Sequence, residues 1–299
     1  MKILVTGATG HVGAHLVRAL TERGRTTRAF VRDPAQAARV LGPDAELAVG
    51  DFADRGSIAR ALDGIDRVFL ACGNVPGQVG FECAVIDAAA SARVRRIVKL
   101  SGPRADVDST LIFERWHGEI ERHLLGSGVP SVVLRPRTYM TNLLAHAATI
   151  QPASQIFAAV GTAPISFVDP YDVAAVAAQV LVEAGHEGRI YEVSGPESLS
   201  HGQIAEELST VLGRRIGYVD VHPEVARQAL LAEGVPESVT EFILGFFASV
   251  QTGSLAETTD AVRRLTGRDP RKFLQFARDH AAQFDGETAD RAPLPAGAR

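Results

Sequence analysis

Cysteine, lysine and long apolar runs are scarce in this chain of 299 residues. Its two cysteines, Cys72 and Cys83, cannot form a disulfide scaffold. The longest strictly apolar stretch in the helical part, Val173–Ala178, is far shorter than the ~20 residues of a membrane-spanning helix. The apolar run near the N-terminus is too short for the apolar core of a signal peptide. We therefore expect a cytoplasmic protein that does not associate with membranes.

An excess of basic charge is also lacking. The chain has 31 lysines and arginines against 35 aspartates and glutamates, which gives a formal net charge of −4. Nucleic acids and anionic membranes normally bind basic surfaces, so both are disfavoured as partners. The hydrophobic share of 46% is typical of folded globular proteins. We expect a small-molecule substrate, and the composition leaves monomer and dimer equally open.

Short apolar runs alternate with helical patterns in the first half of the chain. This alternation predicts right-handed crossovers and a parallel sheet covered by helices on both faces. The predicted strands are residues 2–6, 27–32, 46–49, 67–71, 96–100 and 131–134, and the predicted helices are residues 12–20, 57–62, 80–92 and 110–125.

A glycine pattern joins the first predicted strand to the first predicted helix. It has the spacing Gly-x-x-Gly-x-x-Gly, in which glycine allows a tight turn and a close approach of the backbone to a pyrophosphate. A simple tight turn is the alternative interpretation. The strand before the pattern and the helix after it favour a doubly wound α/β Rossmann sheet that binds a dinucleotide. The candidate cofactor-binding residues are Gly7, Thr9, Gly10, His11, Val12 and Gly13.

The regular alternation of predicted strands and helices ends after residue 136. Helical patterns near 139–148, 171–183, 200–212, 223–233, 236–250 and 269–284 surround short strands at 165–168, 189–193 and 216–221. We predict an NAD(P)-binding domain at 1–155, to which 163–195 returns, and a smaller, mainly helical substrate lobe at 196–284. Residues 285–299 have no periodic apolar pattern, which predicts a flexible tail.

The end of the second strand indicates which dinucleotide binds. An acidic residue at this place would bind the ribose hydroxyls, but the chain has Val31 there, followed by Arg32. Arginine can pair with a 2′-phosphate, so we expect NADP(H) to be preferred over NAD(H). Asp33 lies one residue further on and weakens the argument, and Arg32 could instead be a solvated loop charge.

The third and fourth strands end in two further candidate sites. Asp51 and Phe52 are expected beside the adenine, although Asp51 could instead prepare the next helix. Ala71, Cys72 and Gly73 are small and would leave room for a ribose. Cys72 is interpreted as a space-filling residue and not as a nucleophile. We expect no metal site.

Several longer segments carry a resemblance to a known family. They are VTGATGHVG, VRDP, GDF, LSG, WHGEIERHLLGSGVPSVVLRPRTYMTNL, ISFVDPYDVAAVAAQVL and YEVSGPESLSHGQIAEELSTVLG. Over residues 1–284 the chain resembles the NmrA-like family of atypical short-chain dehydrogenase/reductases. The resemblance implies NADPH-dependent reduction of quinones, azo dyes or triphenylmethane dyes. The family also includes a regulator that senses dinucleotides, and the resemblance leaves this alternative open.

The chain departs from the wider superfamily at the catalytic helix. Ser101 matches the superfamily serine, but no tyrosine is followed by the lysine of the Tyr-x-x-x-Lys motif. The corresponding helix carries His117 and Glu121, which lie about 60° and 100° from Ile120 on the edge of the buried stripe. We expect His117 to donate a proton and Glu121 to orient it and to raise its pKa. A surface His–Glu pair is the alternative.

The resemblance also implies where the nicotinamide and the substrate would lie. Pro136 would pass beside the nicotinamide, and Tyr139, Met140 and Phe167 would line the substrate pocket. Ordinary packing is the alternative for Tyr139.

The residues together favour an NADPH-dependent reductase that transfers a hydride to a quinone, enone or imine. These acceptors need little or no proton from the protein, whereas alcohol oxidation needs the missing base. A catalytically inactive NADP(H)-sensing regulator is the alternative. An epimerase or dehydratase is less favoured, because it also needs that base.

Overall fold

The computed structural model describes residues 1–286, which form two compact units. The first unit consists of Met1–Pro136, Pro170–Val193 and Ala261–Arg268. The second unit consists of the two intervening segments and residues 269–286. Residues 137–155 and 163–169, which we expected in the first domain, therefore belong to the second unit. The predicted tail lies outside the described residues from 287 onward.

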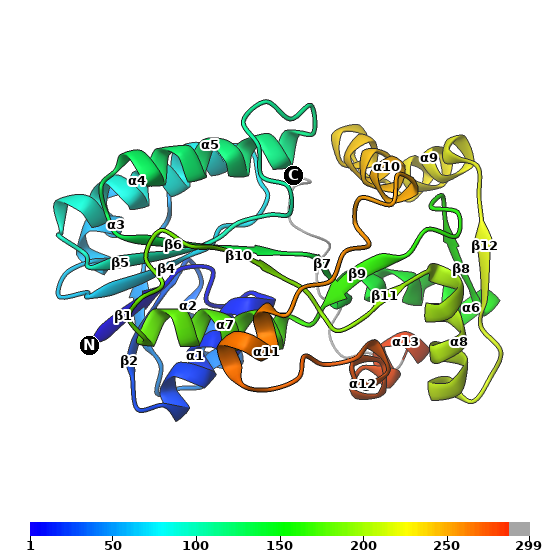
Figure 1. Cartoon of the computed structure of the whole chain (residues 1–299), viewed down its shortest axis with the longest axis horizontal. Coiled ribbons are helices and arrows are strands. Elements are labelled where there is room, and N and C mark those ends of the chain that lie inside the picture. The colour runs from blue at the N-terminus through cyan, green and yellow to red at the C-terminus, as the bar shows by residue number, and fades with distance from the viewer. Residues whose placement is uncertain (287–299) are drawn as a thin grey trace. The chain divides into compact units, whose positions relative to one another are not determined.

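The first unit is built on one parallel sheet of seven strands (Figure 1). The strand order is β10-β6-β5-β4-β1-β2-β3, so the chain winds outward in both directions from β1 and β4. This arrangement confirms the predicted doubly wound α/β fold. The strands are β1 (Lys2–Val5), β2 (Thr26–Val31), β3 (Glu46–Val49), β4 (Arg67–Leu70), β5 (Arg96–Leu100), β6 (Ser131–Pro136) and β10 (Ile190–Val193).

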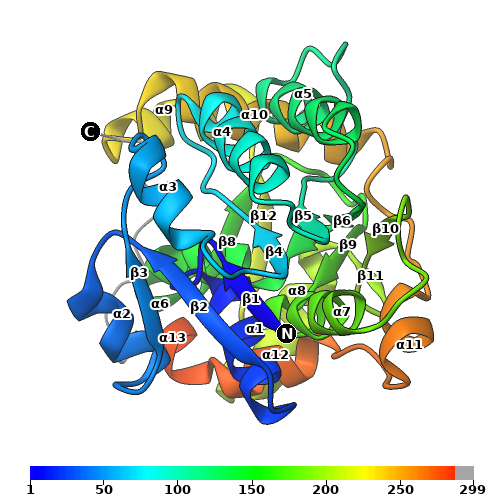
Figure 2. The same ribbon diagram turned by 90° about the vertical axis from the view of Figure 1, so that its left-hand side faces the viewer.

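Helices cover both faces of this sheet (Figure 2). On one face lie α1 (His11–Glu22) and α7 (Pro170–Val182), with α11 (Ala261–Thr266) packed on α7. On the other face lie α3 (Arg55–Ala61), α4 (Gln78–Ser91) and α5 (Ile112–Gly126). Because both faces are covered, β1 and β4 are buried and apolar at residues 3–5 and 68–70.

The short helix α2 (Pro34–Leu41) of this unit was not predicted. Asp33 caps its N-terminus, and its carboxylate accepts from the backbone N–H groups of Ala35 and Gln36. Proline at the first helical position also favours the start of a helix. The helix buries only Ala37, so it lacks the apolar stripe by which longer helices are recognised.

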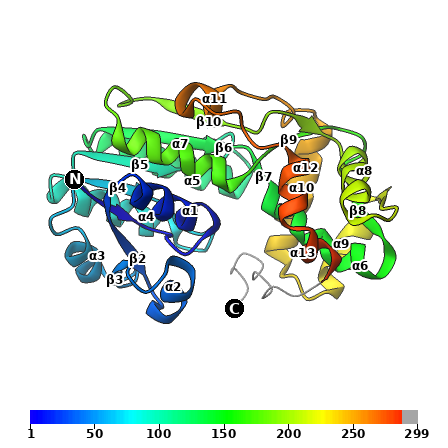
Figure 3. The same cartoon turned by 90° about the horizontal axis from the view of Figure 1, so that it is seen from below.

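The second unit contains two small sheets (Figure 1) and several helices (Figure 3). One sheet joins β11 (Ser198–Leu199), β9 (Ile165–Val168) and β7 (Thr138–Tyr139), and the other pairs β12 (Gly217–Asp220) with β8 (Gln155–Ala158). The helices are α6 (Ala147–Ala153), α8 (His201–Leu212), α9 (Pro223–Ala232), α10 (Glu237–Gln251), α12 (Phe273–Asp279) and α13 (Ala281–Asp285).

Two predicted helices of the second unit were wrong in their extent. The helix expected at 139–148 begins as a 3₁₀ segment, Met140–His146, because Tyr139 is held in β7 by its pairing with Val168 in β9. The closing helix expected at 269–284 is divided into α12 and α13. His280 separates them because its φ of −113° lies outside the helical range.

Two histidines of the second unit, the partly buried His146 and the buried His201, have lowered pKa values. The rings of His146 and His201 pack edge to face, with centroids 5.6 Å apart. Burial lowers the pKa of His146 to about 3 and that of His201 to about 4. The unfolded chain therefore takes up these protons before the folded chain does. Above about pH 6.5, the pKa of a histidine in the unfolded chain, both histidines contribute fully to the stability of the folded state. This contribution is lost as the pH falls below that value.

We expect the free energy of unfolding to fall by up to about 2 kcal/mol per histidine between pH 7.5 and pH 5.0. Urea unfolding at both pH values measures this loss. The double variant His146→Phe/His201→Phe should be less sensitive to pH than the wild type. His222→Asn, which replaces an exposed histidine at the start of α9, should leave the pH dependence unchanged. The same change in the free energy of unfolding between pH 7.5 and pH 5.0 in all three proteins would contradict the prediction.

Candidate functional site

The structure constrains the three glycines of the pattern between β1 and α1 in different ways. Gly7 has a φ of +60°, which favours glycine, and a Cβ there would lie 3.1 Å from the Ala71 carbonyl oxygen. A Cβ on Gly13 would lie only 2.1 Å from the Gly7 carbonyl oxygen. Gly10 has an ordinary extended backbone, and a Cβ there would meet only the Gly7 oxygen, at 3.2 Å. The fold therefore requires Gly7 and Gly13 much more strongly than Gly10.

The missing side chain at Gly10 leaves the N-terminus of α1 open. Gly10 is the N-cap residue of this helix and provides no side-chain hydrogen bond to the first turn. The first N–H groups of a helix lack intrahelical partners, and the helix dipole favours negative charge there. The hydroxyl of Thr6 fixes the neighbouring strand end by donating to the carbonyl oxygen of Ala71 at 2.9 Å. The turn therefore forms a cradle whose free N–H groups could bind an anion such as a diphosphate.

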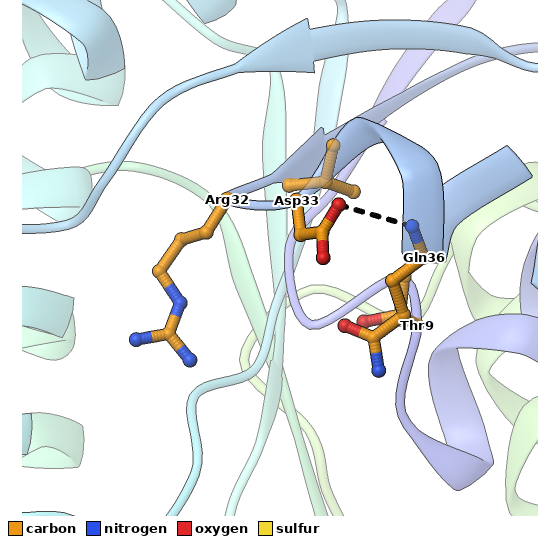
Figure 4. Close-up of a pocket in the computed structure, with 5 residues that line it drawn as sticks. Thr9, Arg32, Asp33 and Gln36 are labelled. Atoms are coloured by element: carbon orange, nitrogen blue, oxygen red, sulfur yellow. Dashed lines mark hydrogen bonds between the residues drawn. The ribbon is translucent and has the colours of Figure 1, made fainter.

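A hollow lies beside this cradle at the end of β2 (Figure 4). Asp33 turns its carboxylate to the backbone of α2, where Oδ1 accepts from the N–H of Gln36 at 3.1 Å. The side chain of Arg32 extends away from Asp33 and is exposed. Within residues 1–286, its guanidinium forms no hydrogen bond or ion pair. The volume of the hollow is about 320 Å³, and its lining residues are Thr9, Val31, Arg32, Asp33 and Gln36.

The next two strand ends carry the other candidate cofactor residues. The carboxylate of Asp51 accepts from the N–H of Ala53 at 2.8 Å, so it shapes the turn before α3. The ring of Phe52 packs against Phe30, with centroids 5.5 Å apart. After β4, burial raises the pKa of the Cys72 thiol to about 12. A thiol in this state is a poor nucleophile, which favours the space-filling interpretation.

Glu121 is paired with an arginine and not with His117, so the predicted His–Glu pair was wrong. Arg135 Nη2 lies 2.6 Å from Glu121 Oε2, and Arg135 Nε donates to Oε1 at 3.1 Å. Ser101 donates its hydroxyl to the same Oε1 at 2.5 Å. A two-pronged guanidinium–carboxylate contact is stronger than an i,i+4 contact with a histidine, so Arg135 of β6 takes the carboxylate. Ser101 and Glu121 thus have partners within one cluster.

The prediction that the pKa of His117 is raised was also wrong. His117 is only 8% exposed, and its ring contacts Lys99 of β5, with 3.4 Å between Nζ and Nδ1. Burial lowers the pKa of His117 well below 6.5, and the positive charges of Lys99 and Arg135 lower it further. The imidazole is therefore uncharged at neutral pH. It can donate a hydrogen bond, but it carries no extra proton to transfer.

Sequence reasoning missed the ion pair beneath His117. Lys99 Nζ lies 2.8 Å from Glu82 Oε2, and both side chains are completely buried. Gln78, one turn before Glu82 in α4, donates to Glu82 Oε1 at 3.0 Å. Burial raises the pKa of Glu82, and Lys99 opposes this rise. The sequence contained one indication of this buried pair: Lys99, one of only three lysines in the chain, lies in an apolar strand.

The three candidate substrate residues lie in the second unit. β7 and β9 pair in parallel, with Thr138 opposite Phe167 and Tyr139 opposite Val168. Met140 and Phe167 are almost completely buried. The Tyr139 hydroxyl is buried without a hydrogen-bond partner among the described residues, and burial raises its pKa. The strand pairing therefore brings the segments of Tyr139, Met140 and Phe167 together.

Residues 1–286 lack two other kinds of site. No helix in this range is long and apolar enough to cross a bilayer. No three or more His, Cys, Asp or Glu side chains in it are grouped so that they could hold a metal ion.

Comparison with known proteins identifies the family. The NAD(P)H azoreductase of Xenophilus azovorans is 37% identical over 94% of this chain and 99% of that protein. The (4-alkanoyl-5-oxo-2,5-dihydrofuran-3-yl)methyl phosphate reductase of Streptomyces griseus is 40% identical over 95% of this chain and 100% of that protein. The structure of the NADPH-dependent quinone oxidoreductase of Escherichia coli with NADPH has a TM-score of 0.85 and 28% identity, over 93% of this chain and 99% of that chain. The model of the NmrA-like family matches residues 1–268, so the chain belongs to the NmrA-like family.

Proposed function

We propose that this chain is an NADPH-dependent reductase of small electrophilic acceptors of the quinone, enone or imine type. The chain is an NAD(P)H-dependent oxidoreductase, as are the relatives named azoreductase and quinone oxidoreductase. The names of its relatives specify an azo compound, an unsaturated furanone and a quinone, which are all conjugated electrophiles. This shared chemistry supports an acceptor that takes a hydride directly.

The proposal depends most on the observation that the imidazole of His117 is buried and uncharged. The superfamily motif would supply a base on this helix, but the chain has a buried, uncharged imidazole there. Oxidation of an alcohol needs a group that removes a proton, and a histidine with a strongly lowered pKa is a weak base. Reduction of a conjugated acceptor needs no such group, because water can protonate the product.

The described residues fit the dinucleotide. The open N-terminus of α1 at Gly10 would hold the diphosphate, and Arg32 would hold the 2′-phosphate. We assign Asp51 and Phe52 to the adenine, and residues 71–73 and Pro136 to the ribose and nicotinamide side. When bound, the reduced nicotinamide supplies the hydride. Ser101 and Glu121, which are held by Arg135, support the strand ends and need not contact the substrate.

Turnover of a panel of acceptors tests the proposal. NADPH oxidation is measured with a quinone, an enone, an imine and an azo dye, and NADPH binding is measured separately by calorimetry. We expect turnover of at least one conjugated acceptor and none of a secondary alcohol with NADP⁺. Tight NADPH binding without turnover of any acceptor would contradict the reductase and favour the NADP(H)-sensing alternative.

The variant Arg32→Ala tests the choice of cofactor. A charge-assisted hydrogen bond contributes roughly 1.5–3 kcal/mol, so the variant should bind NADPH about 10–150-fold more weakly. NADH lacks the 2′-phosphate, and its affinity should change little. Arg39→Ala removes another exposed arginine, in α2, and serves as the matched control. Calorimetry measures both affinities, and an equal loss for both cofactors would show that Arg32 does not read the phosphate.

A further inference from the structure

The ammonium group of Lys99 is surrounded by three acceptors. Nζ donates to Glu82 Oε1 at 3.1 Å and to the backbone carbonyl oxygen of Leu100, and it lies 3.4 Å from Nδ1 of His117. An ammonium group has three N–H donors and no acceptor site. Each donor thus has one partner, and the third partner is the imidazole. A buried charge is tolerated when its hydrogen bonds are satisfied in this way.

This arrangement determines the tautomer of His117. A neutral imidazole has one nitrogen that donates and one that accepts. An ammonium group can only donate, so its 3.4 Å contact with Nδ1 requires an unprotonated Nδ1 and a ring proton on Nε2. Lys99 thus selects one of the two neutral forms, in the way that a partner of one ring nitrogen generally does.

The Nε2 edge of the ring is available to a ligand. It lies against Gly102, which follows β5, and a Cβ on this glycine would come within 2.6 Å of His117 Cδ2 and 3.2 Å of Nε2. Glycine at this place therefore allows the ring edge to reach the carboxyl end of the strand. Among the described residues none accepts a hydrogen bond from Nε2, and His117 keeps 8% of its surface exposed.

The charged groups around the ring all favour its neutral form or are engaged elsewhere. Lys99 from β5 and Arg135 from β6 are positive and oppose protonation of His117. Glu82 from α4 binds Lys99, and Glu121 from the same helix as His117 binds Arg135. Neither carboxylate contacts the imidazole.

We propose that Lys99, anchored by Glu82, is a positioning residue that keeps His117 uncharged with its proton on Nε2, so that Nε2–H donates a hydrogen bond to the oxygen of the acceptor. This role rests on the proposed reductase function and narrows the acceptor to carbonyl-containing conjugated compounds, namely enones and quinones. As a hydride adds to carbon and forms a C–H bond, the displaced π-electron pair moves to the oxygen. His117 stabilises this oxygen without giving up its proton, and water then protonates it.

Nitrogen NMR of the histidine rings tests the tautomer without any turnover. In protein labelled with ¹⁵N-histidine and free of ligand, the signals of His117 are assigned by comparison with His117→Gln. We expect a protonated Nε2 and an unprotonated Nδ1 that do not change between pH 6.0 and 8.5. A proton on Nδ1, or titration of the ring within this range, would overturn the proposal.

The double variant Glu82→Gln/Lys99→Met tests the cause of the tautomer. It removes both buried charges and keeps side chains of similar size, which avoids leaving one charge unpaired. We expect the ring to show both tautomers, or to titrate within the same pH range. Lys2→Met, which removes a partly exposed lysine paired with Glu46 in the same sheet, should leave the His117 signals unchanged. An unchanged spectrum in the double variant would overturn the role of Lys99.

Kinetics test the role of the Nε2–H donor. For an enone or quinone, kcat of the double variant should fall about 10-fold or more and become dependent on pH, while the Kd of NADPH stays unchanged. Wild-type kcat should be independent of pH between 6.0 and 8.5. Equal kcat values would overturn the donor role. Absence of wild-type turnover on every acceptor would overturn the proposed function and the donor role together, whereas the NMR result decides the tautomer alone.

Discussion

The variant Gly10→Val should fold normally and lose its affinity for NADPH. The extended backbone of Gly10 accepts a side chain, and a Cβ there meets only one backbone oxygen, at 3.2 Å. The branched side chain would instead cover the first N–H groups of α1, where the diphosphate is expected to bind. Loss of two charge-assisted hydrogen bonds corresponds to a roughly 10²–10⁴-fold weaker affinity. Calorimetry measures the affinity, and circular dichroism verifies the fold.

Two other glycines provide controls for this variant. Gly126→Val changes a glycine at the end of α5 with no other atom within 4 Å of its Cβ position, and it should bind NADPH normally. Gly13→Ala should destabilise the fold, because its Cβ would lie 2.1 Å from the Gly7 oxygen. Normal NADPH affinity in folded Gly10→Val protein would refute the dinucleotide site at this turn.

Removing one member of the buried Lys99–Glu82 pair should be strongly destabilising. Glu82→Ala would leave the ammonium group of Lys99 completely buried without its counter-charge. Such a change typically lowers the free energy of unfolding by about 3–5 kcal/mol. The double variant Glu82→Gln/Lys99→Met removes both charges and should lose much less stability than Glu82→Ala does.

Urea unfolding at pH 7 measures these differences. Glu46→Ala removes a partly exposed carboxylate that pairs with Lys2 and Arg28 in the same sheet, and should lower stability by only about 0–1 kcal/mol. If Glu82→Ala behaved like Glu46→Ala, the buried pair would not be an important part of the first unit's stability.

The strands of the first unit could be predicted because each is a short apolar run followed by a helical pattern. Thus the expected strand at 96–100 is β5, and the one at 67–71 ends one residue later than β4. The second unit was predicted less well, because its strands contain two to four residues and its segments return from distant parts of the chain. α11, with six residues, is too short to show a helical period.

The candidate site was predictable where its function depends on local backbone geometry. The glycine turn is such a feature, because a turn and the start of a helix are local properties. The partners of His117 are set by the pairing of β5 with its neighbours and by the packing of α4 on α5. A lysine in a strand does not reveal whether it ends in solvent or on Glu82, so spacing along the helix pointed to Glu121 instead.

The discontinuous first unit has a consequence for how the chain folds as it is synthesised. β6 is complete at Pro136, but its outer neighbour β10 ends at Val193, so the polar backbone edge of β6 is uncovered in the meantime. α7 packs on α1 from the other end of the unit, and α11 packs on α7 only after Ala261. Nearly the whole chain must therefore leave the ribosome before the core of the first unit closes. We therefore expect the slow step in the folding of the first unit to follow synthesis of the chain. Chaperones that shield exposed strand edges should increase the yield of folded protein.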